Sequence, residues 1–155
     1  VFCVRDIQHI KIPNFIEHIC SCSFNRCNKL QGIEFSDDSK LQTIGKSAFS
    51  ESSIKRIRIP SSVTFIKEYA FAFCEFLKIF EFSDDSKLQT IDNETFSESS
   101  IKSISIPSSV KLIEERGLYF SRELQIIEIY NLELILNACE IVFSSSKSLI
   151  MVPVH

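Results

Sequence analysis

The sequence predicts a right-handed solenoid of about six stacked coils, each of 23–24 residues, that is mostly β or mixed α/β. Two observations predict it. The first is that long identical segments recur 47 residues further along the chain: SDDSKLQTI at Ser36–Ile44 returns at Ser83–Ile91, and IPSSV at Ile59–Val63 returns at Ile106–Val110. A fixed period of this size inside one sequence is typical of repeat architectures.

The second observation is a strand-like pattern that divides each 47-residue unit into two related halves. It consists of an apolar residue, two residues of any type, a second apolar residue, one residue of any type and a third apolar residue. The last two apolar residues are two positions apart, as residues on the inward face of a β-strand must be. The patterns begin near Ile7, Leu30, Ile54, Leu77, Ile101 and Leu124, and again at Leu149. We therefore expect one domain over 1–155, with a partial first coil at 1–6, a parallel sheet on the concave face and a terminal strand over 149–154.

A second motif follows each strand and forms the return leg of the coil. It consists of an apolar residue, two residues of any type, a second apolar residue, four residues of any type and a phenylalanine. We expect a short strand plus a helical turn in this segment. Three strands end in Ile-Pro, which stops strand pairing because proline has no N–H group. Stacking of the coils predicts an aromatic spine formed by Phe2, Phe24, Phe49, Phe71, Phe96 and Phe143.

The segment Ile54–Cys74, IKRIRIPSSVTFIKEYAFAFC, closely resembles the BspA-type leucine-rich repeat, LxxIxIPxxVxxIxxxAFxxC. The SDDSKLQT and SESSIK variants resemble the BspA-like surface-protein families of parasitic protists, which share this repeat with bacterial surface antigens. The resemblance covers essentially the whole chain. It implies a leucine-rich-repeat solenoid with an adhesin-like role at the cell surface or outside the cell, and it transfers no catalytic residue. The coil with Gly117-Leu118 in place of Ala-Phe departs from the motif.

The charge balance and the hydropathy of the sequence indicate which classes of partner the chain can bind. Lysine plus arginine (17) almost balances aspartate plus glutamate (20), so no overall field favours nucleic acid. The most apolar region, Leu124–Phe143, is interrupted by polar residues, so we expect no membrane insertion by this segment. The given chain shows no signal peptide, which leaves a cytoplasmic location as the alternative to the cell surface.

Six cysteines could form a disulfide framework, but the repeat phase argues against it. Cys27 and Cys74 occupy the same repeat position two coils apart, about 10 Å, whereas a disulfide needs Cα atoms within about 7 Å. We expect both to be buried thiols. Cys20 and Cys22, with His18 nearby, could in principle bind a metal, but a second ligand pair is missing. We therefore expect no metal site.

The sequence also lacks the groups that catalysis would need. A serine or cysteine nucleophile requires a base, and the histidines are His9, His18 and His155, with His9 on the exposed face of the first strand. A chain with three glycines has no phosphate-binding loop. We expect neither an enzyme nor a cofactor.

The outward strand positions are the candidates for partner binding. One column alternates in charge, and we expect it to form a ladder of ion pairs: Lys11, Glu34, Arg58, Glu81, Ser105 and Glu128. A basic stripe beside it could bind an acidic protein or a sulfated glycan, or be an ordinary solvated edge. The candidate binding face is His9, Lys55, Arg56, Arg58, Lys78 and Lys102.

A second candidate is apolar. Five large side chains fall outside the inward columns, where they either form a contact patch or fill gaps between coils: Phe65, Phe73, Phe76, Leu112 and Phe120. Asn93-Glu94-Thr95 is a glycosylation sequon that matters only in a secreted chain.

Together these patterns predict a non-enzymatic module that binds a host or matrix protein, or a sulfated glycan. The alternative is a structural protein packed into a larger assembly through its flanks and ends. Val1-Phe2 aligns with Ala48-Phe49 in the middle of a coil, which suggests a longer repeat array.

Overall fold

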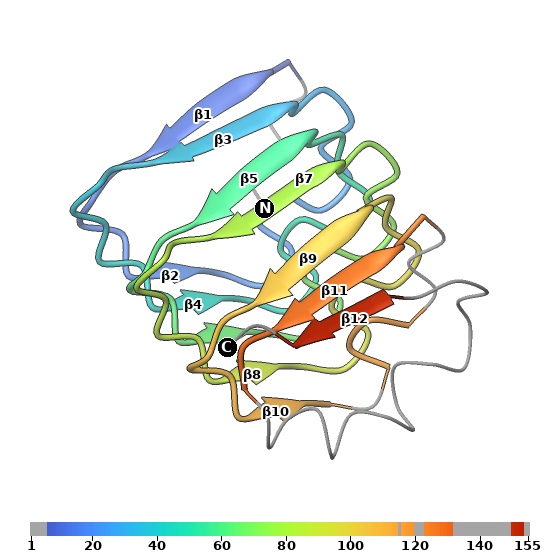
Figure 1. The fold of residues 1–155 in the computed structure, drawn as a ribbon. Helices are drawn as coiled ribbons and strands as arrows, with labels where there is room; N and C mark the ends of the chain where they lie inside the picture. Colours follow the sequence, from blue (N-terminus) through green and yellow to red (C-terminus); the bar gives the residue numbers. More distant parts are fainter. Residues whose placement is uncertain (1–5, 115, 120–122, 132–149, 154–155) are drawn as a thin grey trace.

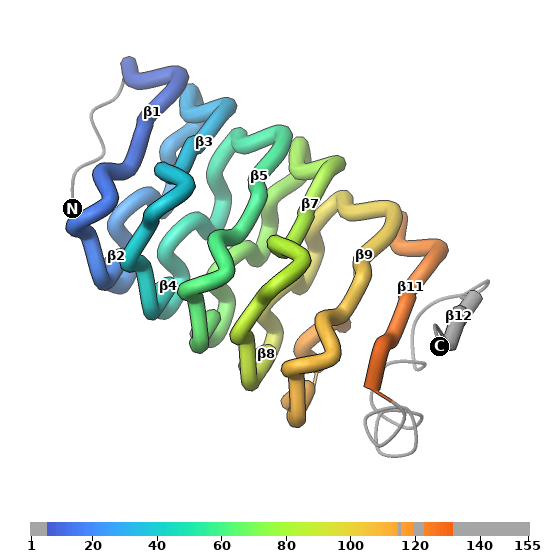
Figure 2. Tube along the Cα trace, turned by 60° about the vertical axis from the view of Figure 1, so that its left-hand side comes forward, coloured from blue at the N-terminus to red at the C-terminus, as the bar shows by residue number. Residues whose placement is uncertain are grey.

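The computed structural model describes residues 6–114, 116–119, 123–131 and 150–153, which wind into a parallel β-solenoid (Figures 1 and 2). A complete coil contributes one four-residue strand and one two-residue strand. The four-residue strands form the long-strand face: β1 (His9–Ile12), β3 (Gly32–Phe35), β5 (Arg56–Ile59), β7 (Ile79–Phe82), β9 (Ser103–Ile106), β11 (Ile126–Ile129) and β12 (Ile150–Pro153). The two-residue strands form the return face: β2 (His18–Ile19), β4 (Thr43–Ile44), β6 (Phe65–Ile66), β8 (Thr90–Ile91) and β10 (Leu112–Ile113).

The predicted aromatic spine is confirmed for its four described members. Phe24 stacks on Phe49 and Phe49 on Phe71, each with ring centroids 5.2 Å apart, and Phe71 stacks on Phe96 at 5.9 Å. The rings are nearly parallel because each coil places its phenylalanine over that of the coil before. Phe80 packs edge-on against two of these rings and links the spine to β7. Phe2 and Phe143 lie outside the described residues.

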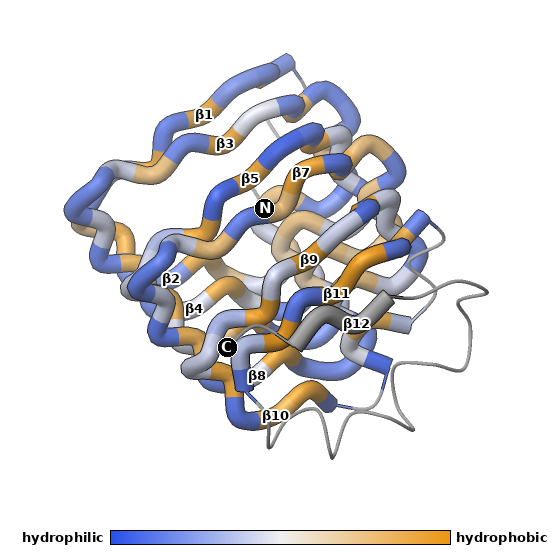
Figure 3. Tube along the Cα trace, in the orientation of Figure 1, coloured by the Kyte–Doolittle hydropathy of each residue, from blue (hydrophilic) through white to orange (hydrophobic). Residues whose placement is uncertain are grey.

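The residues of β5 and β9 alternate between the core and solvent, and Figure 3 shows the accompanying change of hydropathy along these strands. In β5, Ile57 and Ile59 are buried while Arg56 and Arg58 are exposed. The same alternation recurs in β9. No helix with the length and apolar character of a membrane span occurs among the described residues.

The return leg is a run of consecutive turns, so the expected helical turn was wrong: the described residues contain no helix. After β4, every second N–H group donates to a carbonyl of the next coil at 2.8–3.0 Å: Ser47 to Glu68, Phe49 to Ala70 and Glu51 to Ala72. The intervening N–H groups bond locally to the carbonyl three residues earlier. An α-helix would satisfy these donors inside its own coil and leave adjacent coils unlinked here.

This alternation requires left-handed backbone at residues that rarely adopt it. In four coils, two residues with positive φ flank the spine phenylalanine, two positions before and two after it. They are Cys22, Arg26, Ser47, Glu51, Tyr69, Phe73, Glu94 and Glu98, and Arg116 has the same conformation two positions before Leu118, with φ of 51–61° overall. The left-handed conformation costs a non-glycine residue about 1–2 kcal/mol. The inter-coil hydrogen bonds and the buried spine compensate for that cost.

The long strands associate in two doublets and a final triplet. β1 with β3, β5 with β7, β9 with β11 and β11 with β12 each pair over four residues. By contrast, the pairing of β3 with β5 is the single pair Gly32 and Arg56, and β7 and β9 belong to different sheets. The long-strand face therefore opens twice, between these groups.

The Ile-Pro dipeptides that end β5 and β9 account for these openings. Within the pairs β5–β7 and β9–β11, a residue just after the strand extends the pairing: the Ser83 N–H donates to the Ile59 carbonyl at 3.1 Å, and the Tyr130 N–H to the Ile106 carbonyl at 3.4 Å. The equivalent residues after β5 and β9 are Pro60 and Pro107. Since proline has no N–H, this bond cannot form toward β3 or β7.

Replacing Phe71 by alanine should lower the free energy of unfolding by about 3–5 kcal/mol, because it leaves a cavity in the middle of the spine. Chemical denaturation measures the change. Phe65→Ala, which removes an exposed phenylalanine, is the control and should cost about 1 kcal/mol or less. A Phe71→Ala loss below about 1 kcal/mol would contradict the packing described here.

The left-handed backbone at Glu51 (φ 58°) can be tested with two substitutions that both remove its carboxylate. Asparagine adopts this conformation readily, whereas valine, which is branched at Cβ, does not. Glu51→Val should therefore be less stable than Glu51→Asn by about 1–2 kcal/mol in chemical denaturation. Equal stabilities would show that the return leg has another conformation.

Candidate functional site

The outward column of the long strands has the register predicted from the sequence. Lys11 lies opposite Glu34, and Arg58 lies opposite Glu81. The ion pairs, however, run diagonally: Arg56 Nη2 lies 3.0 Å from Glu81 Oε2, and Arg58 Nη2 lies 3.9 Å from Asp84 Oδ1. Ser105 donates a hydrogen bond to Glu128, its partner across the strands. Among the described residues no ion pair joins two members of this column, so the expected ladder of ion pairs is wrong: Arg58 and Glu81 pair with residues outside it.

All six residues of the predicted basic face are exposed on the long-strand side: His9, Lys55, Arg56, Arg58, Lys78 and Lys102. Several are engaged with acceptors from other coils. Lys55 Nζ donates to Gln31 Oε1 at 2.8 Å, and Lys78 Nζ reaches Glu123 at 2.8 Å. The Lys78 hydrogen bond, with a smaller contribution from the charge of Lys102, lowers the pKa of the Glu123 carboxyl. The face therefore carries mixed charge instead of a uniform positive field.

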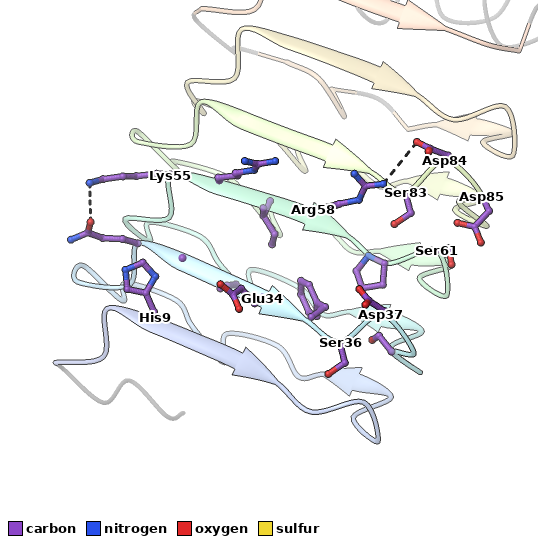
Figure 4. Close-up of a pocket in the computed structure, with 18 residues that line it drawn as sticks. His9, Glu34, Ser36, Asp37, Lys55, Arg58, Ser61, Ser83, Asp84 and Asp85 are labelled. Carbon is purple, nitrogen blue, oxygen red and sulfur yellow. Dashed lines mark hydrogen bonds and ion pairs between the residues drawn. The ribbon is translucent and has the colours of Figure 1, made fainter.

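A groove crosses this face where β3 and β5 diverge (Figure 4). His9 and Lys55 lie toward one end of it, at the beginnings of the strands. Asp37, Asp84 and Asp85 lie toward the other end, in the loops that follow β3 and β7. The incomplete pairing beside Pro60 thus forms a groove with positive charge at one end and negative charge at the other.

Two isoleucines on the same face were not among the residues singled out from the sequence. Ile79 and Ile126 are exposed on β7 and β11, and Ile79 lies directly opposite Arg56. The signal was present in the outward column His9, Gly32, Arg56, Ile79, Ser103 and Ile126, where aliphatic residues replace polar ones. Apolar side chains within a charged surface are what a protein interface needs at its centre.

The residues of the predicted apolar patch lie in two places. Phe65 and Leu112 are exposed on the return face, on β6 and β10, with Thr90 of β8 between them. Phe73 and Phe76 line a separate hollow where the return turns lead back to the long strands. Phe120 lies outside the described residues.

The sequon residues Asn93 and Thr95 contribute to the packing of the return turns. Thr95 is fully buried and its hydroxyl donates to the Asp92 carbonyl at 2.7 Å, while the Asn93 carbonyl accepts from the Tyr69 N–H. In the folded chain Thr95 is therefore buried, whereas Asn93 is half-buried.

The four cysteines that the structure describes form no disulfide, so Cys27 and Cys74 are not paired with each other, as expected. Cys74 is buried, with its Sγ 3.2 Å from the Phe49 carbonyl, to which it donates. Burial raises the pKa of the Cys74 thiol to about 12, although a hydrogen bond with Ser52 acts in the opposite direction. Cys20 is exposed and Cys22 is half-buried. Among the described residues, no three histidine, cysteine or acidic side chains are grouped as metal ligands.

Alkylation with iodoacetamide at pH 8, read out by mass spectrometry, should modify Cys20 in the native protein and Cys74 only after unfolding, because the buried thiol is neutral and inaccessible. The pKa of the Cys74 thiol is higher in the folded chain than its unfolded value of 9.0. The contribution of the neutral thiol to the stability of the fold is therefore complete below pH 9 and is lost as the pH rises toward 12. Cys74→Ala should remove this part of the pH dependence. Equal alkylation of both thiols in the native protein would contradict the burial.

Comparison with known proteins identifies the repeat. The sequence family described as the BspA type leucine rich repeat region, with six copies, matches residues 1–126 and 81–152, and so covers nearly the whole chain. This chain belongs to the BspA-type leucine-rich-repeat family. Leucine-rich repeats of this kind generally serve as protein-interaction modules without catalytic activity.

Solved structures agree with this assignment. The crystal structure of the pneumococcal vaccine antigen PcpA is 30% identical, with a TM-score of 0.76 over 81% of this chain and 31% of the antigen. A leucine-rich repeat protein from Eubacterium ventriosum is 25% identical, with a TM-score of 0.71 over 82% of this BspA-type chain and 33% of that protein. The T. pallidum leucine rich repeat protein, at 24% identity and a TM-score of 0.71 over 78% of this chain and 58% of its own, supports the fold alone.

The BspA-type chain thus spans less than two thirds of these proteins and about a third of PcpA. No curated protein is significantly similar to it.

Proposed function

We propose that this BspA-type domain is displayed at the cell surface and binds a host or matrix protein through its long-strand face. The observation that carries the proposal is a difference between the two 47-residue copies. SESSIK and IPSSV, which flank the strand, are identical in both copies, yet Arg56 and Arg58 of the first copy are Ser103 and Ser105 in the second. The buried residues between them remain isoleucine. Within this strand the buried residues are kept while the outward residues differ, although the return leg also differs, with Leu118 in place of Phe71.

The charges of the face favour a protein over a sulfated glycan. A glycan that carries only negative groups needs cations whose charge is not already compensated. Here Arg56 and Arg58 face Glu81 and Asp84, and three aspartates lie at one end of the groove. A protein surface can present both signs, and the exposed Ile79 and Ile126 add the apolar area that such an interface buries.

The similarity to a vaccine antigen supports the proposed location, since the pneumococcal protein is named as an antigen. Display of this chain at the cell surface is therefore proposed together with its binding function.

The test is binding of the folded chain to immobilised extracellular-matrix proteins, with heparin as the sulfated glycan. The double variant Arg56→Ser/Arg58→Ser copies the residues of the second repeat, so the fold should tolerate it. Its matched control is Lys46→Ser/Lys67→Ser, which removes the same charge and two ion pairs, those with Glu68 and Asp92, from the return side.

We expect binding to at least one matrix protein, about tenfold or more weaker in the long-strand variant and unchanged in the control. Binding to heparin and to none of the matrix proteins would show that the partner is a sulfated glycan and not a protein. Equal loss in both variants, or no binding by the native chain, would contradict the proposal.

A further inference from the structure

Two phenylalanines are exposed on the flank of the solenoid, away from the long-strand face. Phe73 and Phe76 are 47% and 53% exposed, and they line one hollow together with Glu51 and Glu75. We call this the flank hollow: Phe73, Phe76, Glu51, Glu75, Asn28, Ser52 and Ser53. Large aromatic side chains at half exposure lose much of the stabilisation that burial would give them.

The repeat provides an internal comparison, because the equivalent positions of other coils show what the fold requires. The positions that match Phe73 hold Arg26, Glu51, Glu98 and Phe120, and those that match Phe76 hold Lys29, Ser53, Ser100 and Glu123. All of these residues except Phe120 are polar or charged. Coils with Arg26, Glu51 or Glu98 at the Phe73 position form without an aromatic ring there, so packing of the coil does not require the two phenylalanines.

The backbone at Phe73 strengthens this conclusion. Its φ is 57°, in the left-handed region, where small polar residues and glycine are favoured over aromatic ones. Its N–H makes the regular inter-coil bond to the Ser97 carbonyl at 2.7 Å, which any non-proline residue could make. Neither the conformation nor the hydrogen bond selects phenylalanine here.

The rim of the flank hollow is acidic. Glu51 and Glu75 line it. The guanidinium of Arg26 lies 3.1 Å from Glu51. Two carboxylates against one guanidinium leave the rim negative, and a negative rim attracts a partner with basic groups around its apolar contact residues.

We propose that the flank hollow binds a segment of a partner protein in which apolar anchor residues are flanked by lysine or arginine. This site lies apart from the long-strand face and goes beyond the function proposed above. The anchors cover Phe73 and Phe76, and the basic flanks meet Glu51 and Glu75. In protein interfaces, the residues that contribute most to binding are often aromatic and are surrounded by a rim of other residues.

The test uses a displayed library of random dodecapeptides, selected on the folded chain, with the affinities of selected peptides measured by fluorescence anisotropy. The main variant is Phe73→Asn/Phe76→Ser: asparagine tolerates the left-handed backbone, and serine is the residue of Ser53 and Ser100. The control is Phe65→Thr, which removes an exposed phenylalanine elsewhere and copies Thr43 and Thr90, its partners across the return strands. The charge variant is Glu75→Lys.

Selected peptides should combine aromatic or aliphatic anchors with a net positive charge. Their binding should weaken about tenfold or more in the double variant and measurably in Glu75→Lys, and remain unchanged in Phe65→Thr. Circular dichroism and the denaturation midpoint check that each variant is folded.

Several results would overturn the proposal: no enrichment of peptides, enrichment of acidic or purely polar peptides, or equal affinity for the native chain and the double variant. Dimerisation of the native chain that disappears in the double variant, seen by sedimentation, would assign the flank hollow to a second copy instead. Because Arg56 and Arg58 are intact in all of these variants, the long-strand proposal can fail or hold independently.

Discussion

Stacking of coils at the spacing of neighbouring β-strands is the constraint on which this structure depends. Backbone donors and acceptors on each side of a coil must find partners, and on the return side they find them through alternate N–H groups that reach the next coil. This arrangement forces residues such as Ser47 and Glu51 into left-handed backbone. It also brings Phe49 directly over Phe71, so that the hydrogen bonds and the ring stacking hold the same spacing.

The two sides of the solenoid differ in how continuous this pairing is. The five described strands of the return face form one sheet, from β2 to β10, whereas the pairing of the long strands is interrupted beside Pro60 and Pro107. Continuity on one side lets the other side open without separating the coils. The groove, with its mixed charges and nearby isoleucines, is a consequence of this difference. A proline that removes one backbone donor thus shapes the surface on which the proposed function depends.

The core was predictable from the sequence because the buried apolar residues must recur at a regular spacing along the chain. The register of the outward columns and the spine from Phe24 to Phe96 follow from apolar spacing alone. The turns were not predictable in the same way. Glu51 and Phe73 have none of the glycine or asparagine character that usually signals left-handed backbone, and the spacing of apolar residues along the return leg fits either a helix or a series of turns.

The charged partners escaped prediction for a different reason. Arg56 pairs diagonally with Glu81, and Lys78 reaches Glu123, 45 residues away, because long flexible side chains span more than one coil. The exposure of Phe73 and Phe76 also needed the structure, since sequence alone left open whether they fill gaps between coils. Interactions fixed by the repeat were predictable, while those that depend on side-chain reach were not.

Scalar couplings across hydrogen bonds, measured by NMR on the isotopically labelled chain, test whether the return leg bonds to the next coil. We expect couplings from the amide groups of Ser47, Phe49 and Glu51 to the carbonyl carbons of Glu68, Ala70 and Ala72 on the next coil. Couplings from the same amide groups to carbonyls four residues earlier would show a helix on the return leg and would contradict this arrangement.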